Sequence, residues 1–235
     1  MTRASTLSDV RLIPAPERGI WRLGKARGPF TYDRIREEDA GSPSGNRWSL
    51  VDCGVLYCAS EHEGCFAEAL APFRVDPAMR AIIADDWANP SHMPPGRIPR
   101  DWTTRHTLFR LQPVKEARFL DVDDEDTLTV LSRELRDQLA KLNIDRITAR
   151  HIEDSTDPSA RRVTRQISAW AEHQSTGTGS EERHIHGIAY RSGLGRYQCW
   201  AVFEGVELSK EESSLVFPEA DALRKVAQDY TLTML

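Results

Sequence analysis

The strongest structural signal in the chain is a leucine repeat within residues 126–142. Five leucines recur at spacings of three and four, with charged residues between them: Leu128, Leu131, Leu135, Leu139 and Leu142. This spacing places them on one face of an amphipathic helix that must cover a hydrophobic core. The pattern therefore predicts a helix that begins at Asp126. A second helix of the same kind is expected over residues 160–173, burying Val163, Ile167 and Trp170.

The other expected elements are short strands rich in apolar and β-branched residues. They are predicted at residues 19–23, 48–59 with an interruption at 52–54, 106–111, 118–120, 187–191 and 199–208. Strands and helices do not alternate regularly, so the sequence favours an α+β fold over a doubly wound sheet.

A single domain is expected at this length of 235 residues. Residues 1–18 would form an N-terminal extension, 19–217 the domain, and 218–235 a C-terminal helix packed on it. That helix can start at Pro218, with Ala222, Leu223, Val226 and Ala227 on one side. Loops are expected at 89–100, which holds four prolines, and at the glycine-containing stretch 176–183.

Composition excludes several classes of function. The formal net charge of −5 argues against direct nucleic-acid binding, which needs a basic face. The cluster Arg161, Arg162 and Arg165 is then a solvated helix face or an anion-binding group. Residues 1–8 lack the apolar stretch of a secretory signal, and no apolar run reaches membrane-spanning length. A cytoplasmic protein that does not enter the membrane is expected.

The four cysteines do not form a recognisable metal-binding pattern. Cys53, Cys58 and Cys65, with His62 between them, contain no C-x-x-C pair. We expect buried thiols, which a reducing cytosol would keep unpaired, and no metal site.

A helix is expected to follow the strand at 55–58. Residues 60–63 have the spacing of a capping box, with Ser60 as the N-cap, and Pro72 disfavours helix beyond 70 or 71. Phe66 and Leu70 share a face of this helix. Glu68 projects from another side, where it could line a cleft.

Four polar residues stand at the ends or on the faces of these elements: Arg47 before a strand, Tyr57 within it, Glu68 on the next helix and Ser192 far downstream. Each also has a purely structural explanation. The arginine could be a surface ion-pair partner, the tyrosine a core aromatic, the glutamate a solvated helix residue and the serine a turn former.

Motifs around these residues resemble the RES family, named for its Arg, Glu and Ser. The matching stretches read Gly45-Asn46-Arg47-Trp48-Ser49, Leu56-Tyr57-Cys58-Ala59, Phe66-Ala67-Glu68, His186-Gly187-Ile188-Ala189-Tyr190-Arg191-Ser192 and Trp200-Ala201-Val202-Phe203-Glu204. The similarity extends in order from Trp21 to Val216. Asn46 stands where the family has a second glycine, and Ser49 replaces the usual asparagine. The 124 residues from Glu68 to Ser192 suggest an elaborated middle section.

The resemblance implies an ADP-ribosyltransferase-like fold, a mixed sheet surrounded by helices around an NAD-binding cleft. Family members act as bacterial toxins, often paired with a helix-turn-helix antitoxin. They cleave NAD⁺ at the nicotinamide–ribose bond, so NAD⁺ would be a substrate and no prosthetic group is expected. Carried over by position, the site would comprise Arg47, Tyr57, Glu68 and Ser192, with Arg22 as a further NAD-binding residue.

The residue types suit this chemistry. A carboxylate at Glu68 would stabilise the oxocarbenium-like ribosyl cation. Arg47, and Arg22 second, would bind the pyrophosphate. Tyr57 would hold the nicotinamide or its ribose by stacking and a hydroxyl bond. Ser192 would position the same groups and not attack, since no motif places a histidine base beside it.

The expected function is NAD⁺ cleavage by phosphorolysis or hydrolysis. One alternative keeps the site and transfers ADP-ribose to a protein. The other is a catalytically inactive module that binds NAD-like ligands.

Overall fold

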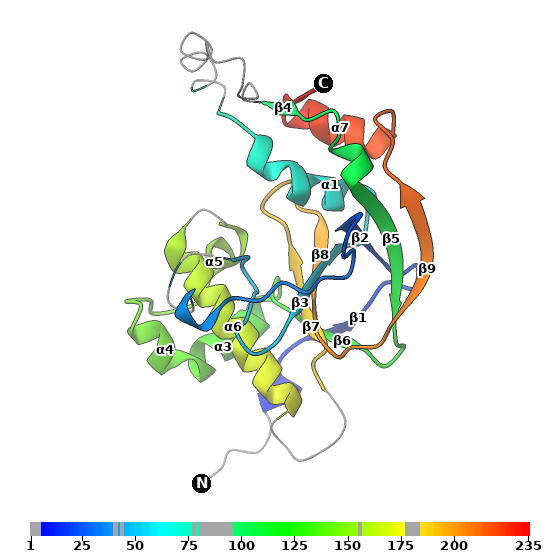
Figure 1. Cartoon of the computed structure of the whole chain (residues 1–235). Coiled ribbons are helices and arrows are strands. Elements are labelled where there is room, and N and C mark those ends of the chain that lie inside the picture. Colours follow the sequence, from blue (N-terminus) through cyan, green and yellow to red (C-terminus); the bar gives the residue numbers. More distant parts are fainter. Residues whose placement is uncertain are drawn as a thin grey trace.

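A curved mixed β-sheet runs through the molecule, with helices at one end and along one side (Figure 1). The computed structural model describes residues 6–39, 42, 45–76, 79, 96–154, 157–176 and 184–235. Most of the proline-rich stretch 89–100 and nearly all of 176–183 lie outside these ranges.

Eight strands of the described chain form this sheet, in the order β1-β6-β7-β8-β3-β2-β5-β9. Their bounds are β1 Leu12–Pro14, β2 Ile20–Lys25, β3 Val55–Ala59, β5 His106–Pro113, β6 Arg118–Asp121, β7 Gly187–Arg191, β8 Gln198–Phe203 and β9 Leu208–Leu215. Neighbours are antiparallel except β6 and β7, which are parallel. Two further short strands, β4 (Arg97–Ile98) and β10 (Thr233–Met234), pair with each other.

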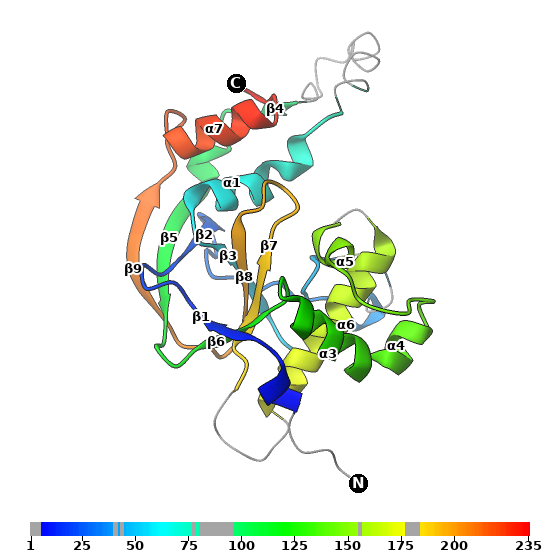
Figure 2. The same cartoon turned by 180° about the vertical axis from the view of Figure 1, so that it is seen from behind.

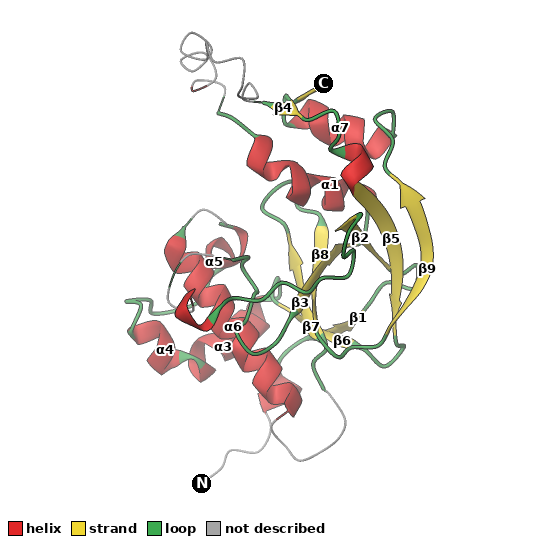
Figure 3. Cartoon of the chain, viewed as in Figure 1, coloured by secondary structure: helices red, strands yellow, loops and turns green. Residues whose placement is uncertain are grey.

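The helices form two groups. Helix α1 (His62–Leu70) packs on α7 (Asp221–Asp229) at one end of the sheet. Helices α3 (Glu125–Glu134), α4 (Arg136–Ala140), α5 (Ala149–Glu153) and α6 (Pro158–Thr176) gather beside the sheet, as the reverse view and the secondary-structure colouring show (Figures 2 and 3). This second group is the connection between β6 and β7, since parallel neighbours require a long crossover.

The sheet separates two hydrophobic clusters. In β3, Val55 and Ala59 belong to the larger cluster, and Leu56 and Cys58 to the smaller one on the opposite face. Tyr57 packs against the larger cluster. This alternation follows from the two-residue period of a strand, and it directs Tyr57 toward α1.

The predicted α+β class and mixed sheet are confirmed. The leucine repeat is core: Leu128, Leu131, Leu135 and Leu139 are buried and Leu142 packs against them. The strands predicted near residues 19, 106, 118 and 187 and the helix over 160–173 are present within a few residues of the expected bounds.

Two predictions of continuous elements were wrong. The leucine helix breaks at Leu135, whose φ of −98° and ψ of 14° are not helical, so α3 and α4 share one buried stripe. The strand predicted at 199–208 ends at Phe203 as β8, and Gly205, with a φ of 86°, lies in the turn before β9 begins at Leu208.

Three predicted starts were also wrong. Residues 48–54 form turns and bends, since their backbone groups bond to other segments. Helix α7 begins at Asp221 and not at Pro218. Ser60 does not cap α1: the N-cap is Glu61, without a side-chain bond, and the Ser60 hydroxyl accepts a hydrogen bond from Trp200 Nε1 at 3.0 Å.

None of the described helices is both long enough and apolar enough to cross a membrane.

Candidate active site

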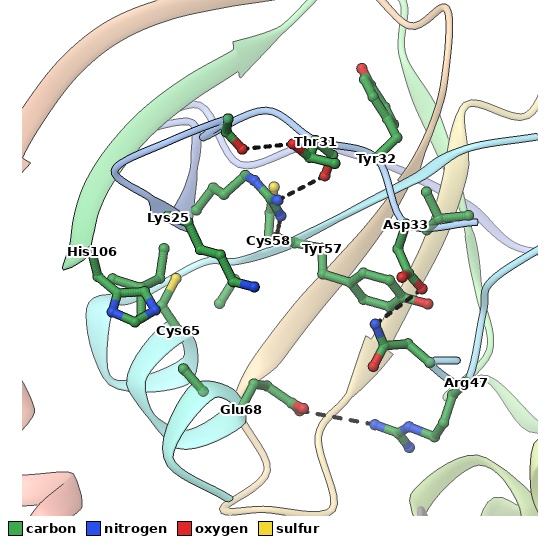
Figure 4. A pocket seen from close by; sticks show the side chains of 18 of the residues that line it. Lys25, Thr31, Tyr32, Asp33, Arg47, Tyr57, Cys58, Cys65, Glu68 and His106 are labelled. Carbon is green, nitrogen blue, oxygen red and sulfur yellow. Dashed lines mark hydrogen bonds and ion pairs between the residues drawn. The ribbon is translucent and has the colours of Figure 1, made fainter. Parts of the chain in front are cut away.

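A cavity of about 600 Å³ opens between α1, strands β2 and β3, and the loops around residues 27–33 and 46–47. Side chains from all of these segments point toward it (Figure 4). Its size is within the range of small-molecule sites. The wall includes four sequence-predicted residues, Arg22, Arg47, Tyr57 and Glu68.

Glu68 reaches the cavity because α1 packs one face against the core and turns another toward the cavity. Phe66 and Leu70 on α1 are fully buried, whereas the Glu68 side chain is 38% exposed. Its Oε1 accepts a hydrogen bond from Ser192 Oγ at 2.5 Å and lies 4.0 Å from Arg47 Nη2. The expectation that Glu68 projects away from the apolar face is confirmed. The carboxylate is held on one side and open to the cavity on the other.

Ser192 contacts the carboxylate from behind. It follows β7, is 1% exposed, and its Oγ also accepts a hydrogen bond from the backbone N–H of Leu194 at 3.0 Å. Ser192 does not belong to the cavity wall, and its hydroxyl donates to Glu68. Its contacts suit a residue that fixes Glu68.

Arg47 lies deep in the wall, at 7% exposure. Its Nη1 donates to the carbonyl of Ile152, its Nη2 faces Glu68, and its guanidinium carbon is 5.1 Å from the Tyr190 ring centre. Thr164 on α6 donates to the Arg47 carbonyl at 2.8 Å. The guanidinium therefore contacts three protein groups: the Ile152 carbonyl, the Glu68 carboxylate and the Tyr190 ring.

Gly45, the first residue of the motif 45–49, has a backbone conformation that favours glycine. Its φ is +76°, a left-handed conformation that side-chain-bearing residues rarely adopt. The turn delivers Arg47 to the cavity wall.

Tyr57 is set into the wall by its hydroxyl. The backbone N–H of Trp48 donates to Tyr57 Oη at 3.0 Å, and Ser49 Oγ is also 3.0 Å from it. Burial raises the pKa of Tyr57 above its ordinary value. The phenol is therefore protonated in the neutral pH range.

Arg22 on β2 holds a loop in place. Its guanidinium donates to the carbonyls of Pro29 at 2.7 Å, Thr31 at 3.0 Å and Tyr57 at 3.0 Å. Burial lowers the pKa of Arg22. These three bonds join the loop at 28–31 to β3 and thereby shape one side of the cavity.

The order and spacing of these elements match a known family. The RES domain family matches residues 19–218, most of the chain. The chain belongs to the RES domain family. No curated protein matches it. Among solved structures, the M. tuberculosis MbcT–MbcA toxin–antitoxin complex contains a similar chain, with 13% identity, a TM-score of 0.47, and coverage of 92% of this chain and 90% of that one.

The RES domain thus brings the five predicted residues to one place, from β2, the turn that holds Arg47, β3, α1 and the turn after β7. Their roles toward a ligand stay predictions. Sequence reasoning missed several other residues of the wall, namely Lys25, Arg27, Asp33, His106 and Tyr190, and named Arg161 only as part of a basic cluster. Tyr190 stands in the quoted motif, but nothing in the sequence marked it as part of the cavity.

Two of the missed residues are exposed cations that line the cavity. The side chains of Lys25 and Arg27 line it and make no side-chain hydrogen bond or ion pair with the residues that the structure describes. Arg161 also lines it and donates to the Gly45 carbonyl at 3.0 Å. Positive charge in a partly enclosed cavity favours an anionic ligand.

Two histidines, His106 in the cavity wall and His186, each bond to the backbone through Nδ1. His106 Nδ1 lies 2.7 Å from the Trp102 carbonyl, an acceptor, so this nitrogen carries the proton. Burial lowers the pKa of His106. His186 Nδ1 accepts from the Arg118 backbone N–H at 3.1 Å.

The cysteines are all buried free thiols. Burial raises the pKa of Cys58, which lines the cavity, to about 12, so it is not a reactive thiolate at neutral pH. Within the described ranges, His, Cys, Asp and Glu side chains form no group of three or more that could hold a metal ion.

Proposed function

We propose that this RES domain cleaves NAD⁺ at the nicotinamide–ribose bond, with phosphate or water as the acceptor. The observation that carries the proposal is the placement of Glu68. Its carboxylate faces a cavity whose volume lies within the range of small-molecule sites and is held there by Ser192 and Arg47.

The proposed chemistry needs a fixed negative charge. As the C–N bond breaks, its electron pair leaves with nicotinamide and the ribose carbon becomes cation-like. An acceptor oxygen, from water or phosphate, then bonds to that carbon, and its proton passes to solvent water. Glu68 stabilises the developing positive charge, and the Ser192 hydroxyl keeps the carboxylate from rotating away.

The contacts of Arg47 suggest a different division of work from the one expected from sequence. Arg47 is 7% exposed, one of its five N–H groups donates to the Ile152 carbonyl, and its Nη2 lies 4.0 Å from Glu68 Oε1. Because this charge is buried and faces Glu68, we assign Arg47 to orienting the carboxylate. We assign the pyrophosphate to Lys25 and Arg27, two exposed cations in the cavity wall.

The acceptor is determined by product analysis. Purified protein is mixed with NAD⁺, with and without phosphate. ADP-ribose-1″-phosphate indicates phosphorolysis and free ADP-ribose indicates hydrolysis. Turnover that requires an added protein indicates ADP-ribosyl transfer. No NAD⁺ loss under any of these conditions would refute the proposed cleavage and leave a binding module.

We further propose that the protein is a toxin with a cognate helix-turn-helix antitoxin, as resemblance to the RES toxins implies. Expression of the chain alone should slow growth and lower cellular NAD⁺. Co-expression of the antitoxin should restore both. Harmless high-level expression of the folded protein would contradict the toxin assignment.

A further inference from the structure

A chain of hydrogen bonds behind the cavity wall runs from Tyr57 to Asp33. Ser49 Oγ lies 3.0 Å from Tyr57 Oη and also donates to Asp33 Oδ2. Asn46 Nδ2 donates to the same carboxylate oxygen at 3.1 Å. Figure 4 shows Asp33 beside the hydroxyl end of the Tyr57 ring. All of these residues except Ser49 line the cavity.

Counting protons fixes the direction of this chain. An ionised carboxylate only accepts, so the single hydroxyl proton of Ser49 goes to Asp33. Ser49 Oγ must then accept the proton of Tyr57 in the bond between the two hydroxyls. Tyr57 Oη in turn accepts from the Trp48 N–H.

The consequence for Tyr57 is that its hydroxyl proton is already used inside the protein. It is not free to donate to a ligand, so the ring face is what Tyr57 offers to the cavity. Two bonds at the hydroxyl, from Trp48 and to Ser49, stop the ring from tilting.

We infer that Asp33 is a positioning residue, which acts through Ser49 to hold the Tyr57 ring against the ligand. That the ligand is a nicotinamide nucleotide rests on the proposed function. The hydrogen-bond chain itself does not.

The two departures from the RES pattern meet at this carboxylate. Ser49 replaces the usual asparagine and Asn46 replaces a glycine, and both donate to Asp33. Position 46 has no positive φ, unlike Gly45, so a side chain is tolerated there. Asp33 is held opposite β3 by two backbone hydrogen bonds with Val55, each 2.9 Å long. The three side chains thus form one unit, whereas a glycine at 46 would offer no side-chain donor.

The first arm of the test observes Tyr57 directly. In protein labelled with ¹³C at the tyrosine ζ-carbon, Tyr57→Phe identifies the Tyr57 resonance by removing it. Asp33→Ala and Ser49→Ala should both shift this resonance. Asp145→Ala, a matched loss of an exposed aspartate outside the cavity wall, should leave it in place. An unmoved resonance in Ser49→Ala and in folded Asp33→Ala would overturn the inference.

The second arm measures NAD⁺ binding by calorimetry in a Glu68→Gln background, so that NAD⁺ is not consumed. Asp33→Ala and Ser49→Ala should each weaken binding about tenfold, the effect of one good hydrogen bond. Asp33→Ala should add no further loss when Tyr57→Phe is already present, because both remove the same bond chain. Additive losses would overturn the inference. If the Glu68→Gln protein itself did not bind NAD⁺, the proposed function would be contradicted. The Tyr57 resonance of the first arm would still test the hydrogen-bond chain from Tyr57 to Asp33.

Discussion

Replacing Glu68 by glutamine removes the charge that the proposed reaction depends on and leaves the shape of the site. The amide carbonyl of the new side chain can still accept the Ser192 hydroxyl bond. Loss of a charge aimed at a developing cation costs about 3 kcal/mol in the transition state, or roughly a hundredfold in turnover. The cost to folding is smaller. Glu68 is 38% exposed and 4.0 Å from Arg47, and such pairs contribute at most about 1 kcal/mol.

Turnover of NAD⁺ and the melting temperature are measured together in wild type and Glu68→Gln. We expect a fall of about a hundredfold in kcat, and a Tm lowered by no more than about 4 °C. The control is Glu63→Gln, the same change on the same helix at a residue outside the cavity wall. It should leave turnover unchanged, and its loss of charge in the first turn of α1 should lower Tm by no more than about 4 °C. Equal turnover by Glu68→Gln and wild type would refute the mechanism.

Three further predictions follow from the site. Arg47→Lys keeps the charge, but a lysine cannot contact Ile152, Glu68 and Tyr190 together. Both Tm and NAD⁺ turnover should therefore fall, and unchanged values of both in side-by-side assays would place Arg47 outside the site. Arg22→Lys should lower Tm by more than about 2 °C, because lysine cannot span three carbonyls, which thermal unfolding checks; a wild-type melting curve would count against the loop-holding role. NAD⁺ loss should survive chelation, since the leaving group needs no Lewis acid; abolition by EDTA with recovery on adding zinc or magnesium would make a metal necessary.

Much of the fold could be predicted because periodic burial leaves a direct trace in sequence. The leucines from 128 to 139 are buried as their spacing indicated, and β7 has its predicted bounds. The errors occurred where tertiary contacts override local pattern. Ser60 has the residue type of an N-cap, but its hydroxyl is taken by Trp200 on a distant strand. No local window of sequence contains that competition.

The site was predictable in membership but not in contacts. The motifs named Arg47, Tyr57 and Glu68, and all three line one cavity. The sequence could not show that Arg47 would donate a hydrogen bond to Ile152, 105 residues away. Nor could it show that Asp33 would accept the Ser49 hydroxyl that contacts Tyr57. Long-range bonds of this kind depend on how the sheet and the α3–α6 connection pack, and no spacing rule contains that information.

The long connection between β6 and β7 has a consequence for the order in which the site forms. Thr164 and Ser168 on α6 bond the carbonyls of Arg47 and Trp48, and Glu68 meets Ser192 across 124 residues. During synthesis, the first half of the site leaves the ribosome long before the residues that hold it. In a nascent chain that ends before Ser192, the Glu68 carboxylate lacks its bond from the Ser192 hydroxyl, so this contact forms only after β7 and the turn that follows it have been synthesised.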